Sequence, residues 1–487
     1  MSSKVNLKLN FIYNIIYQVL LLITPLITAP YISRVIGAEG IGNYSFTQSI
    51  VMYFSLIAAI GSGTHGQRGV AGRRNDEHAL SVFSCEVILL RWLTTLVSLG
   101  LYSVFISTQA EKYTGLYLVQ VITIVSVGFD VTWIFQGLEN FKITVSTQIL
   151  AKILSVVAIF AFVKSESDLL FYVAACTLPI LIGYFFLWPN LCHVIKRVNI
   201  KELHPFRHLK PEIQLFIPYI GTLLFSYIDK TMLGYILVNG IENGYYEQAL
   251  KFISMATALV SAISTVVIPR MAYYFKEADN SHLKFYSIEG TRAIMCLSCL
   301  LSGGMFSVAS NIIPWFYGEG YDQSILLLQI LSVMMLVKGI NNYYGSAILI
   351  PSFRQNKYAI GIWCSAGVNI IINYFLIKEL GAVGACISSV ISEFVLFAFM
   401  IYYVGDLISV GDYIKNSYKY IISCGISSMI TCVVGKMLGA SVLNTITLTI
   451  IVTVVYCLAL LLLKDEFFGT FLCKSFEFVN HKKHIDS

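Results

Sequence analysis

Ten ionisable side chains lie inside long apolar stretches of the sequence, where charges are rare. Five are acids and five are bases: Glu86, Arg91, Asp130, Lys152, Asp229, Lys230, Glu247, Lys251, Lys338 and Glu393. A charge at bilayer depth is costly, so such groups pair with one another or line a wet cavity along a transport path. Glu247 and Lys251 are four residues apart and share one helical face, where they can pair. Asp229 and Lys230 are adjacent and must point to different neighbours.

Two interpretations of these charges stay open. Equal numbers of acids and bases permit complete pairing, in which case the charges hold a helix bundle together. Their spread over six or seven predicted helices in both halves of the chain favours a polar cavity instead. Glu86 and Lys152 lie near predicted helix ends, where an interfacial position explains them equally well.

The composition predicts which elements must position these groups. Of the 487 residues, 57% are hydrophobic and only 12% are charged, with a mean hydropathy of +0.74. A soluble domain has about a quarter of its residues charged, because its surface faces water. Apolar runs of about twenty residues recur along the whole chain, without the alternation of a membrane barrel. We therefore predict an all-α polytopic membrane protein with about 14 transmembrane helices, at residues 10–33, 43–67, 80–107, 113–136, 143–163, 168–189, 213–237, 245–270, 288–313, 324–348, 358–378, 382–404, 418–437 and 442–463.

The distribution of basic residues predicts the orientation. The net charge of +6 alone would suit nucleic acid, but the Lys and Arg residues gather in the linkers after even-numbered spans. This pattern places those linkers and both termini in the cytoplasm and argues against a nucleic-acid partner. Residues 1–10 are polar with two lysines and lack a cleavage site, so we interpret them as a mature cytoplasmic end. The longest linker, residues 191–212, is too short to fold as a domain, and the function must lie within the membrane.

The two halves of the chain share a spacing pattern. Gly42 and Tyr44 open one predicted span that closes at Arg68, and Gly244 and Tyr246 open another that closes at Arg270. An offset of six spans keeps the orientation, which predicts two pseudo-symmetric six-helix bundles related by an axis along the membrane normal. The predicted divisions are residues 1–205 and 206–405 for the two bundles, and residues 406–487 for two additional transmembrane helices and a cytoplasmic tail.

Motifs of soluble catalysis do not emerge from the sequence. It contains no phosphate-binding loop, dinucleotide turn or nucleophile elbow. Cys296 and Cys299 form a single C-x-x-C inside a predicted span, which small residues for helix packing explain better than a metal or redox site. His204 and His208 are four apart, but Pro205 breaks the helix that would align them. We predict no catalytic residue, no metal and no cofactor.

Several stretches resemble a known family. They are NFIYNIIYQVLLLITPLITAPYISRVIGAEGIGNYSFTQ (10–48), DVTWIFQGLENFKI (130–143), IDKTMLGYI (228–236), GYYEQALKF (244–252) and ELGAVGACIS (379–388). Together they resemble the Wzx-type polysaccharide repeat-unit flippases, which belong to the multidrug/oligosaccharidyl-lipid/polysaccharide exporter superfamily. The resemblance runs through about the first four hundred residues. It implies two six-helix bundles around a central cavity.

The resemblance also implies a substrate and a set of cavity residues. The substrate would be an undecaprenyl-diphosphate-linked oligosaccharide, flipped from the inner to the outer leaflet of a bacterial cytoplasmic membrane for O-antigen, capsule or exopolysaccharide synthesis. A polysaccharide polymerase and chain-length proteins would be further partners. A diphosphate needs cationic partners to cross the bilayer. The matching motifs carry over Arg34, Asp130, Asp229, Lys230, Glu247 and Lys251, whereas Arg91, Lys152 and Lys338 rest on the burial argument alone.

Two rival functions have different sequence requirements. A drug/cation antiporter of the same superfamily would usually carry an acid in the first span, but residues 10–33 contain Asn14 and Gln18 and no acid. A polytopic glycan polymerase would need a long outer loop for catalysis, and every predicted outer linker is short. We therefore predict a transporter rather than an enzyme, with the antiporter as the main alternative.

Overall fold

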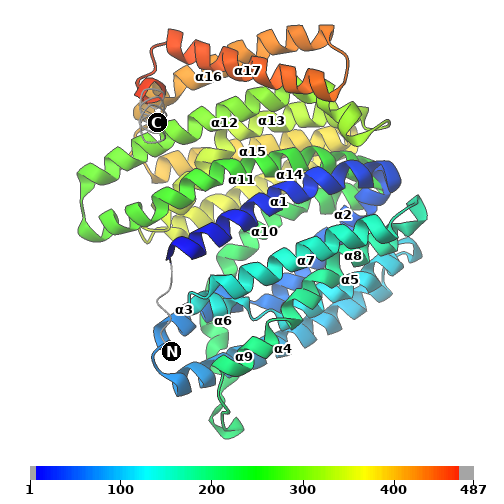
Figure 1. Ribbon diagram of the computed structural model, residues 1–487, viewed down its shortest axis with the longest axis vertical. Coiled ribbons are helices and arrows are strands. Elements are labelled where there is room, and N and C mark those ends of the chain that lie inside the picture. Colours follow the sequence, from blue (N-terminus) through cyan, green and yellow to red (C-terminus); the bar gives the residue numbers. More distant parts are fainter. Residues whose placement is uncertain (1–6, 471–487) are drawn as a thin grey trace, which may run out of the picture. The chain divides into compact units, whose positions relative to one another are not determined.

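The computed structural model describes residues 7–470, and within that range every regular element is a helix (Figure 1). The first half of the chain forms α1 (Leu7–Val35), α2 (Gly37–Ala59), α3 (Ser62–Arg73), α4 (Glu77–Ser107), α5 (Glu111–Phe129), α6 (Thr132–Gly137), α7 (Phe141–Phe162), η1 (Glu166–Asp168), α8 (Leu169–Phe185), α9 (Trp188–Val194), η2 (Ile200–Glu202), η3 (Pro205–His208) and α10 (Leu209–Leu237). The second half forms α11 (Gly240–Glu277), α12 (Asn280–Tyr317), α13 (Asp322–Tyr343), the π-helical turn η4 (Tyr344–Leu349), α14 (Gln355–Leu380), α15 (Ala382–Tyr403), α16 (Val410–Met437) and α17 (Val442–Leu462).

Polar side chains fix where several helices begin. Asp76 accepts a hydrogen bond from the Ala79 amide at the start of α4, and Asp279 accepts one from the His282 amide at the start of α12. Ser409 begins α16 with a reciprocal capping box. Such caps satisfy amides that have no partner within the helix, and they stop the apolar run from extending into the linker.

The helices have the length and surface of membrane spans. Among the described residues, 12 helical segments are long and apolar enough to cross a bilayer. The helices α1 and α10 coincide with the predicted first and seventh spans but are outside that set, so the number fourteen stays a prediction. Large apolar side chains on the outer faces are exposed, such as Leu96, Val104 and Leu462. Exposed apolar surface on this scale requires lipid. The predicted all-α polytopic membrane fold is confirmed.

The chain divides into two compact units, residues Met1–Gly244 and Tyr245–Ser487. The bundle boundaries predicted from the repeat, at residues 205 and 405, stay predictions. The predictions about residues 1–6 and about the basic tail after residue 470 lie outside the described residues.

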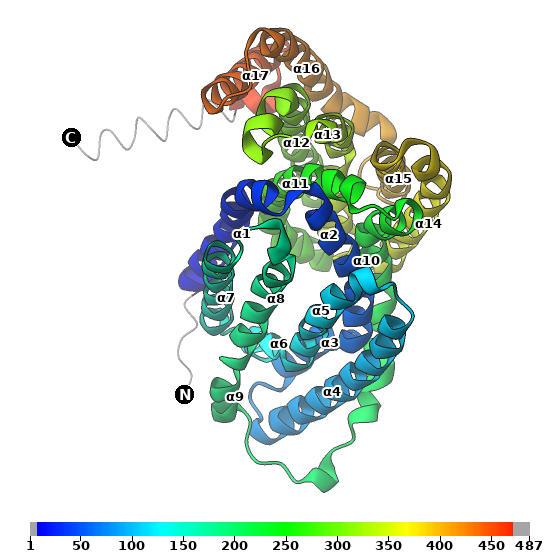
Figure 2. The ribbon, with the colours of Figure 1, turned by 90° about the vertical axis from the view of Figure 1, so that its right-hand side faces the viewer.

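The first unit is built around α2, α5 and α8. The helix α2 packs on α4, α5 and α10, while α5 and α7 both pack on α8 and α1 packs on α7 (Figure 2). Its core includes Phe46, Tyr102, Tyr117 and Ile124. The Tyr102 hydroxyl donates to the Tyr117 carbonyl at 2.9 Å, so even the aromatic core carries a satisfied polar group.

The second unit is centred on α12, which packs on α13, α16 and α17. The two last helices are held by specific contacts as well as by apolar packing. Asn311 on α12 donates to the Leu438 carbonyl at the end of α16, Trp315 donates to Thr445 on α17 at 2.7 Å, and Tyr456 donates to the Cys296 carbonyl at 2.8 Å. These bonds make α16 and α17 part of the second unit rather than a detached pair.

Candidate functional site

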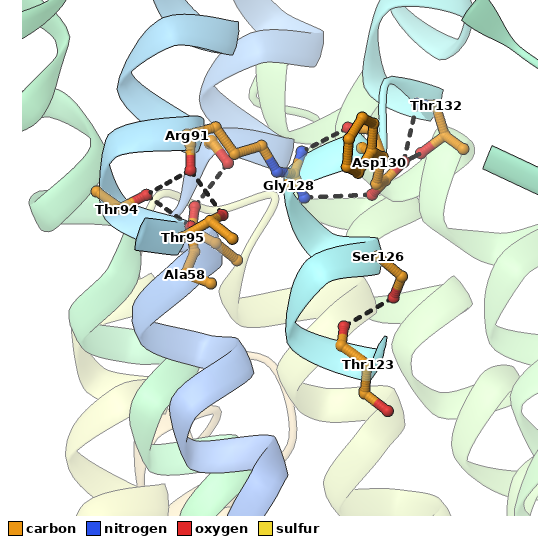
Figure 3. Close-up of polar contacts among 12 residues, drawn as sticks. Ala58, Arg91, Thr94, Thr95, Thr123, Ser126, Gly128, Asp130 and Thr132 are labelled. Carbon is orange, nitrogen blue, oxygen red and sulfur yellow. Dashed lines mark hydrogen bonds and ion pairs between the residues drawn. The ribbon is translucent and has the colours of Figure 1, made fainter. Parts of the chain in front are cut away.

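A buried ion pair lies at the junction of α5 and α6 in the first unit. Arg91 on α4 is 5% exposed. One guanidinium nitrogen donates to the Asp130 carbonyl at 2.9 Å, and the other is 3.3 Å from the Asp130 carboxylate (Figure 3). The Arg91 side chain is 6% exposed and the Asp130 side chain 19%, so the acid is the more accessible partner. The structure thus brings together two of the predicted site residues that lie 39 positions apart in sequence.

The ion pair sits where a membrane helix is interrupted. Asp130 has extended backbone angles, ending α5 at Phe129 before α6 begins at Thr132. Its second carboxylate oxygen accepts from both the amide and the hydroxyl of Thr132, at 2.9 and 2.6 Å. An aspartate that bonds the backbone two residues on forms a local turn. Asp130 therefore both breaks the helix and starts the next one.

The interruption frees carbonyl groups that need donors in an apolar environment. Trp92 donates its indole N–H to the Gly128 carbonyl at 3.0 Å, and Trp188 donates to the Phe129 carbonyl at 3.0 Å. Arg91 supplies the third donor, to Asp130 itself. Each of the last three carbonyls of the broken end thus has a side-chain partner. Arg91 combines two roles here, because it neutralises the Asp130 carboxylate and caps a helix end.

The adjacent buried residues Asp229 and Lys230 lie on α10, a helix that packs against α2. Asp229 is 5% exposed and Lys230 is 9% exposed, and the Lys230 ammonium lies 5.4 Å from the centre of the Tyr227 ring. Next to them, Thr231 bonds both Ser49 and Tyr53 of α2, at 2.8 and 2.9 Å. The ammonium over an aromatic face is a cation–π arrangement.

Three glycines allow the helices of this region to approach one another closely. A Cβ at Gly234 would lie 2.0 Å from the Phe46 ring, and a Cβ at Gly42 would lie 1.7 Å from the Gly240 carbonyl oxygen. A Cβ at Gly244 would lie 2.0 Å from the Ala38 carbonyl oxygen. The start of α11 thus touches the backbone of α2, a contact that only small residues allow.

A second buried ion pair lies inside the second unit. Glu393 on α15 is 3% exposed and bonds the Lys338 ammonium of α13. Asn341 adds an amide donor to the other carboxylate oxygen, at 2.8 Å. The π-helical turn η4 begins directly after α13, three residues beyond Asn341. Such turns shift the register of a helix and are frequent at functional sites.

The remaining predicted site residues occupy more accessible places. Arg34 is exposed at the end of α1 and donates to the Pro30 carbonyl at 3.1 Å. Lys152 is half-buried in a groove between α7 and α8 that Thr147, Gln148 and Tyr184 also line. Glu247 and Lys251 are half-buried on α11 of the second unit. The role of all nine predicted residues in binding substrate stays a prediction.

Sequence reasoning missed a polar cluster that ties the linker 191–212 to α4. Glu86 is fully buried and accepts from the His204 amide at 2.7 Å, from Arg207 and from His208 Nε2 at 2.8 Å. Because a carboxylate only accepts, His208 Nε2 carries the proton and Nδ1 accepts from His65 Nε2 at 3.0 Å. Burial lowers the pKa of His208 despite the opposing effect of Glu86, which keeps this imidazole neutral at pH 7. The only sequence signal was a basic, histidine-containing linker following an acid at a span end.

Comparison with known proteins identifies the family. A family model described as "Polysaccharide biosynthesis protein" matches residues 7–275. The chain belongs to this family. It is 23% identical over 390 residues to a putative O-antigen transporter of Shigella dysenteriae, covering 77% of this chain and 94% of that protein. It is 22% identical over 420 residues to a putative O-antigen transporter of Escherichia coli K12, covering 83% and 98%.

Solved structures show the same fold. The lipid II flippase MurJ in an inward closed conformation matches with a TM-score of 0.75 at 15% identity, over 94% of this chain and 99% of that one. A multidrug resistance MATE family transporter of the MOP superfamily matches with a TM-score of 0.58 at 15% identity, over 79% and 95%. The predicted resemblance to polysaccharide flippases is confirmed by the family model and by relatives that are described as transporters rather than enzymes. The solved structures confirm the fold.

Proposed function

We propose that this protein flips undecaprenyl-diphosphate-linked oligosaccharide repeat units from the inner to the outer leaflet by alternating access. The observation that carries the proposal is the family match over residues 7–275, together with relatives described as O-antigen transporters that align along nearly their whole length. Short linkers between long apolar helices support the proposal too, because the groups that act on the substrate must then lie within the membrane.

The chemistry of the substrate fits the buried charges. A diphosphate cannot cross hydrocarbon without cationic partners, and its sugars need a wet polar path. An inside-negative membrane potential drives an anion outward with about 2.3 kcal/mol per charge per 100 mV. Lys230 is the cation that we propose for the diphosphate, since it is only 9% exposed and lies in a motif that carried the family resemblance. Lys251, Arg34 and Arg91 are proposed to take over as the protein changes conformation, with Asp229 and Glu247 holding the lysines when no substrate is bound.

The cellular setting follows from the same proposal. The protein would lie in the bacterial cytoplasmic membrane with both termini in the cytoplasm, as the Lys/Arg distribution favours. There the lipid-linked repeat unit is available on the inner side. A polysaccharide polymerase and chain-length proteins would use the flipped product on the outer side.

The experiment that tests the proposal is complementation of a strain that lacks this gene. We expect the wild-type chain to restore surface glycan, and Lys230→Ala to abolish it with nearly normal protein abundance, because a binding cation has gone but the fold remains. Lipid-linked repeat units should accumulate at the inner leaflet. Surface glycan, protein level and lipid-linked precursor are measured together for each variant.

The double variant Asp229→Ala, Lys230→Ala separates binding from stability. If Lys230 only neutralises Asp229, the single variant leaves a buried charge and lowers abundance, and the double variant restores export. Normal export by the double variant would therefore contradict the binding role. Lys276→Ala is the matched control, since this lysine is exposed in the last turn of α11, and its export should equal that of wild type.

A further inference from the structure

One buried acid takes no part in the ion pairs described above. Glu212 lies in the first turn of α10 and is 0% exposed. Neither of its carboxylate oxygens has a hydrogen-bond partner in the part of the chain that the structure describes. Glu86 and Glu393 are buried to a similar degree, but each accepts several hydrogen bonds. Glu212 is thus the exception among three buried glutamates of similar exposure.

The position of Glu212 is fixed by an interruption in another helix. Between α2 and α3, Ile60 and Gly61 adopt left-handed backbone angles with φ of 36° and 88°. A Cβ on Gly61 would lie 2.4 Å from the Glu212 carbonyl oxygen. The first turn of α10 therefore packs directly against this interruption, and the glycine is what allows the approach.

The charged surroundings of Glu212 point to one partner. The helix α10 packs on α2, α3 and η3, and α4 packs on α3 and η3. Besides Glu86 and Arg91 of α4, the charged or titratable groups on the neighbouring parts of these elements are His65, Arg68, Arg73, Arg207, His208 and Lys210. His65, Arg207 and His208 are joined to Glu86 by the bonds described above, and Arg68 and Arg73 are exposed. Arg91 is the group whose charge acts on Glu212.

Arg91 also has unused bonding capacity. Two of its nitrogens bond Asp130, whereas Nε is buried without a partner among the described residues. A buried carboxylate without hydrogen bonds is unstable, so Glu212 must hold a proton in this arrangement. We propose that Glu212 is a proton-binding site, and that its ionised form competes with Asp130 for Arg91.

The competition would link a proton to the shape of the first unit. When Glu212 releases its proton to water, the electron pair stays on the carboxylate and Arg91 keeps its own charge. Turning the guanidinium toward Glu212 removes the donor from the Asp130 carbonyl, which loosens the junction of α5 and α6. The proton site stands on the geometry alone, while its use in driving flipping rests on the proposed function.

Infrared spectroscopy of the purified full-length protein tests the site without a substrate. A protonated carboxyl group has a separate C=O band that shifts in D₂O. We expect the wild-type protein to show such a band at neutral pH, Glu212→Gln to lose it, and high pH to remove it reversibly. Glu393→Gln is the matched control, because Glu393 is buried but bonded to Lys338 and Asn341, and it should leave the band unchanged.

Two further variants test the competition for Arg91. Asp130→Asn frees the guanidinium to stabilise ionised Glu212, so the titration midpoint of the band should move to lower pH. Arg91→Gln should move it to higher pH. A band that survives in Glu212→Gln overturns the site, and one that persists until the protein unfolds overturns the exchange of its proton. Failure of the wild-type chain to restore export, together with a normal band and titration, would instead count against the proposed function alone.

Discussion

The two units carry helical segments of nearly the same length that differ in continuity. In the first unit, Gly37–Arg73 covers 37 residues and is broken at Ile60 and Gly61. The segment Gly240–Glu277, which belongs to the second unit from Tyr245 onward, covers 38 residues as one helix. The contrast repeats further along. The 27 residues from Glu111 to Gly137 are broken at Asp130, but the 28 residues from Asp322 to Leu349 continue through a π-helical turn.

The segments Glu111–Gly137 and Asp322–Leu349 occupy equivalent places in their units, because both end in the same turn. Glu139 and Phe353 each follow the segment and each have a φ of 60°. Three amide-to-carbonyl bonds recur around them at a constant offset of 214 residues, 138 to 134, 139 to 136 and 140 to 135 in the first unit and 352 to 348, 353 to 350 and 354 to 349 in the second. The superposition of the two units as a whole stays a prediction.

The two units differ in where their acids lie relative to the helix interruptions. The two interruptions in the first unit lie beside acids, the buried Glu212 at one and the partly buried Asp130 at the other. In the second unit, the buried Glu393 on α15 bonds Lys338 on α13, and both of these helices are unbroken at the ion pair. Departures from regular structure inside a membrane are costly and tend to mark functional parts. The first unit therefore has two interior places where a functional role is expected.

The largest effect expected from this contrast concerns the two buried ion pairs. Arg91→Met leaves Asp130 buried and removes the donor at a helix break, which should lower the free energy of unfolding by about 3–5 kcal/mol. Lys338→Met should cost less, about 1–3 kcal/mol. The Lys338 side chain is 29% exposed, and Glu393 keeps its bond to Asn341. Thermal unfolding of the purified variants gives the comparison.

A double variant separates the charge of Arg91 from its role as a hydrogen-bond donor. Arg91→Met combined with Asp130→Asn should recover part of the loss, since no buried charge remains. The recovery should be incomplete because the Asp130 carbonyl still lacks its donor. Equal losses for Arg91→Met and Lys338→Met would show that the helix break adds nothing to the role of Arg91.

The next effect tests the interruption itself. Gly61→Ala places a Cβ on left-handed backbone, which alone costs about 1–2 kcal/mol, and pushes it against the Glu212 carbonyl. Gly63→Ala is the matched control, because its Cβ would meet nothing within 4 Å and it lies in α3. Alanine there should stabilise by about 0.5–1 kcal/mol. If both variants unfold at the same temperature, the close packing at Gly61 is wrong.

The sequence predicted the spans well because apolar length and charge placement decide them. It also singled out Arg91 and Asp130, since charges in apolar runs stand out, but it could not show that they meet across 39 residues. Glu212 was missed because it lies at the predicted end of a basic linker, where an acid normally faces water. The helix breaks were missed because hydropathy carries no backbone angles, although Gly61 and Gly63 around Ser62 were a usable signal.

The smallest effect concerns the ion pairs beside the two matching turns. Arg354 bonds Asp406 through both carboxylate oxygens, one of them at 2.8 Å, with side chains 30% and 48% exposed. The bonds to Arg354 hold the pKa of Asp406 below its ordinary value. A lowered folded pKa contributes stability that is complete above the unfolded pKa of about 3.9 and is lost as the pH falls through the folded value. Asp406→Asn should thus lower the unfolding temperature at pH 7 by an amount worth less than about 1 kcal/mol, because exposed pairs are weak.

An ion pair beside the matching turn of the first unit provides the reference for this measurement. Arg74 and Glu139 meet at 3.4 Å, with side chains 54% and 49% exposed. A longer and more exposed ion pair is weaker than a two-point bond, so Glu139→Gln should change the unfolding temperature less than Asp406→Asn. The gap between Asp406→Asn and wild type should close as the pH falls below the unfolded pKa of the acid. A gap that stays constant into acid would show that Asp406 contributes through packing and not through its charge.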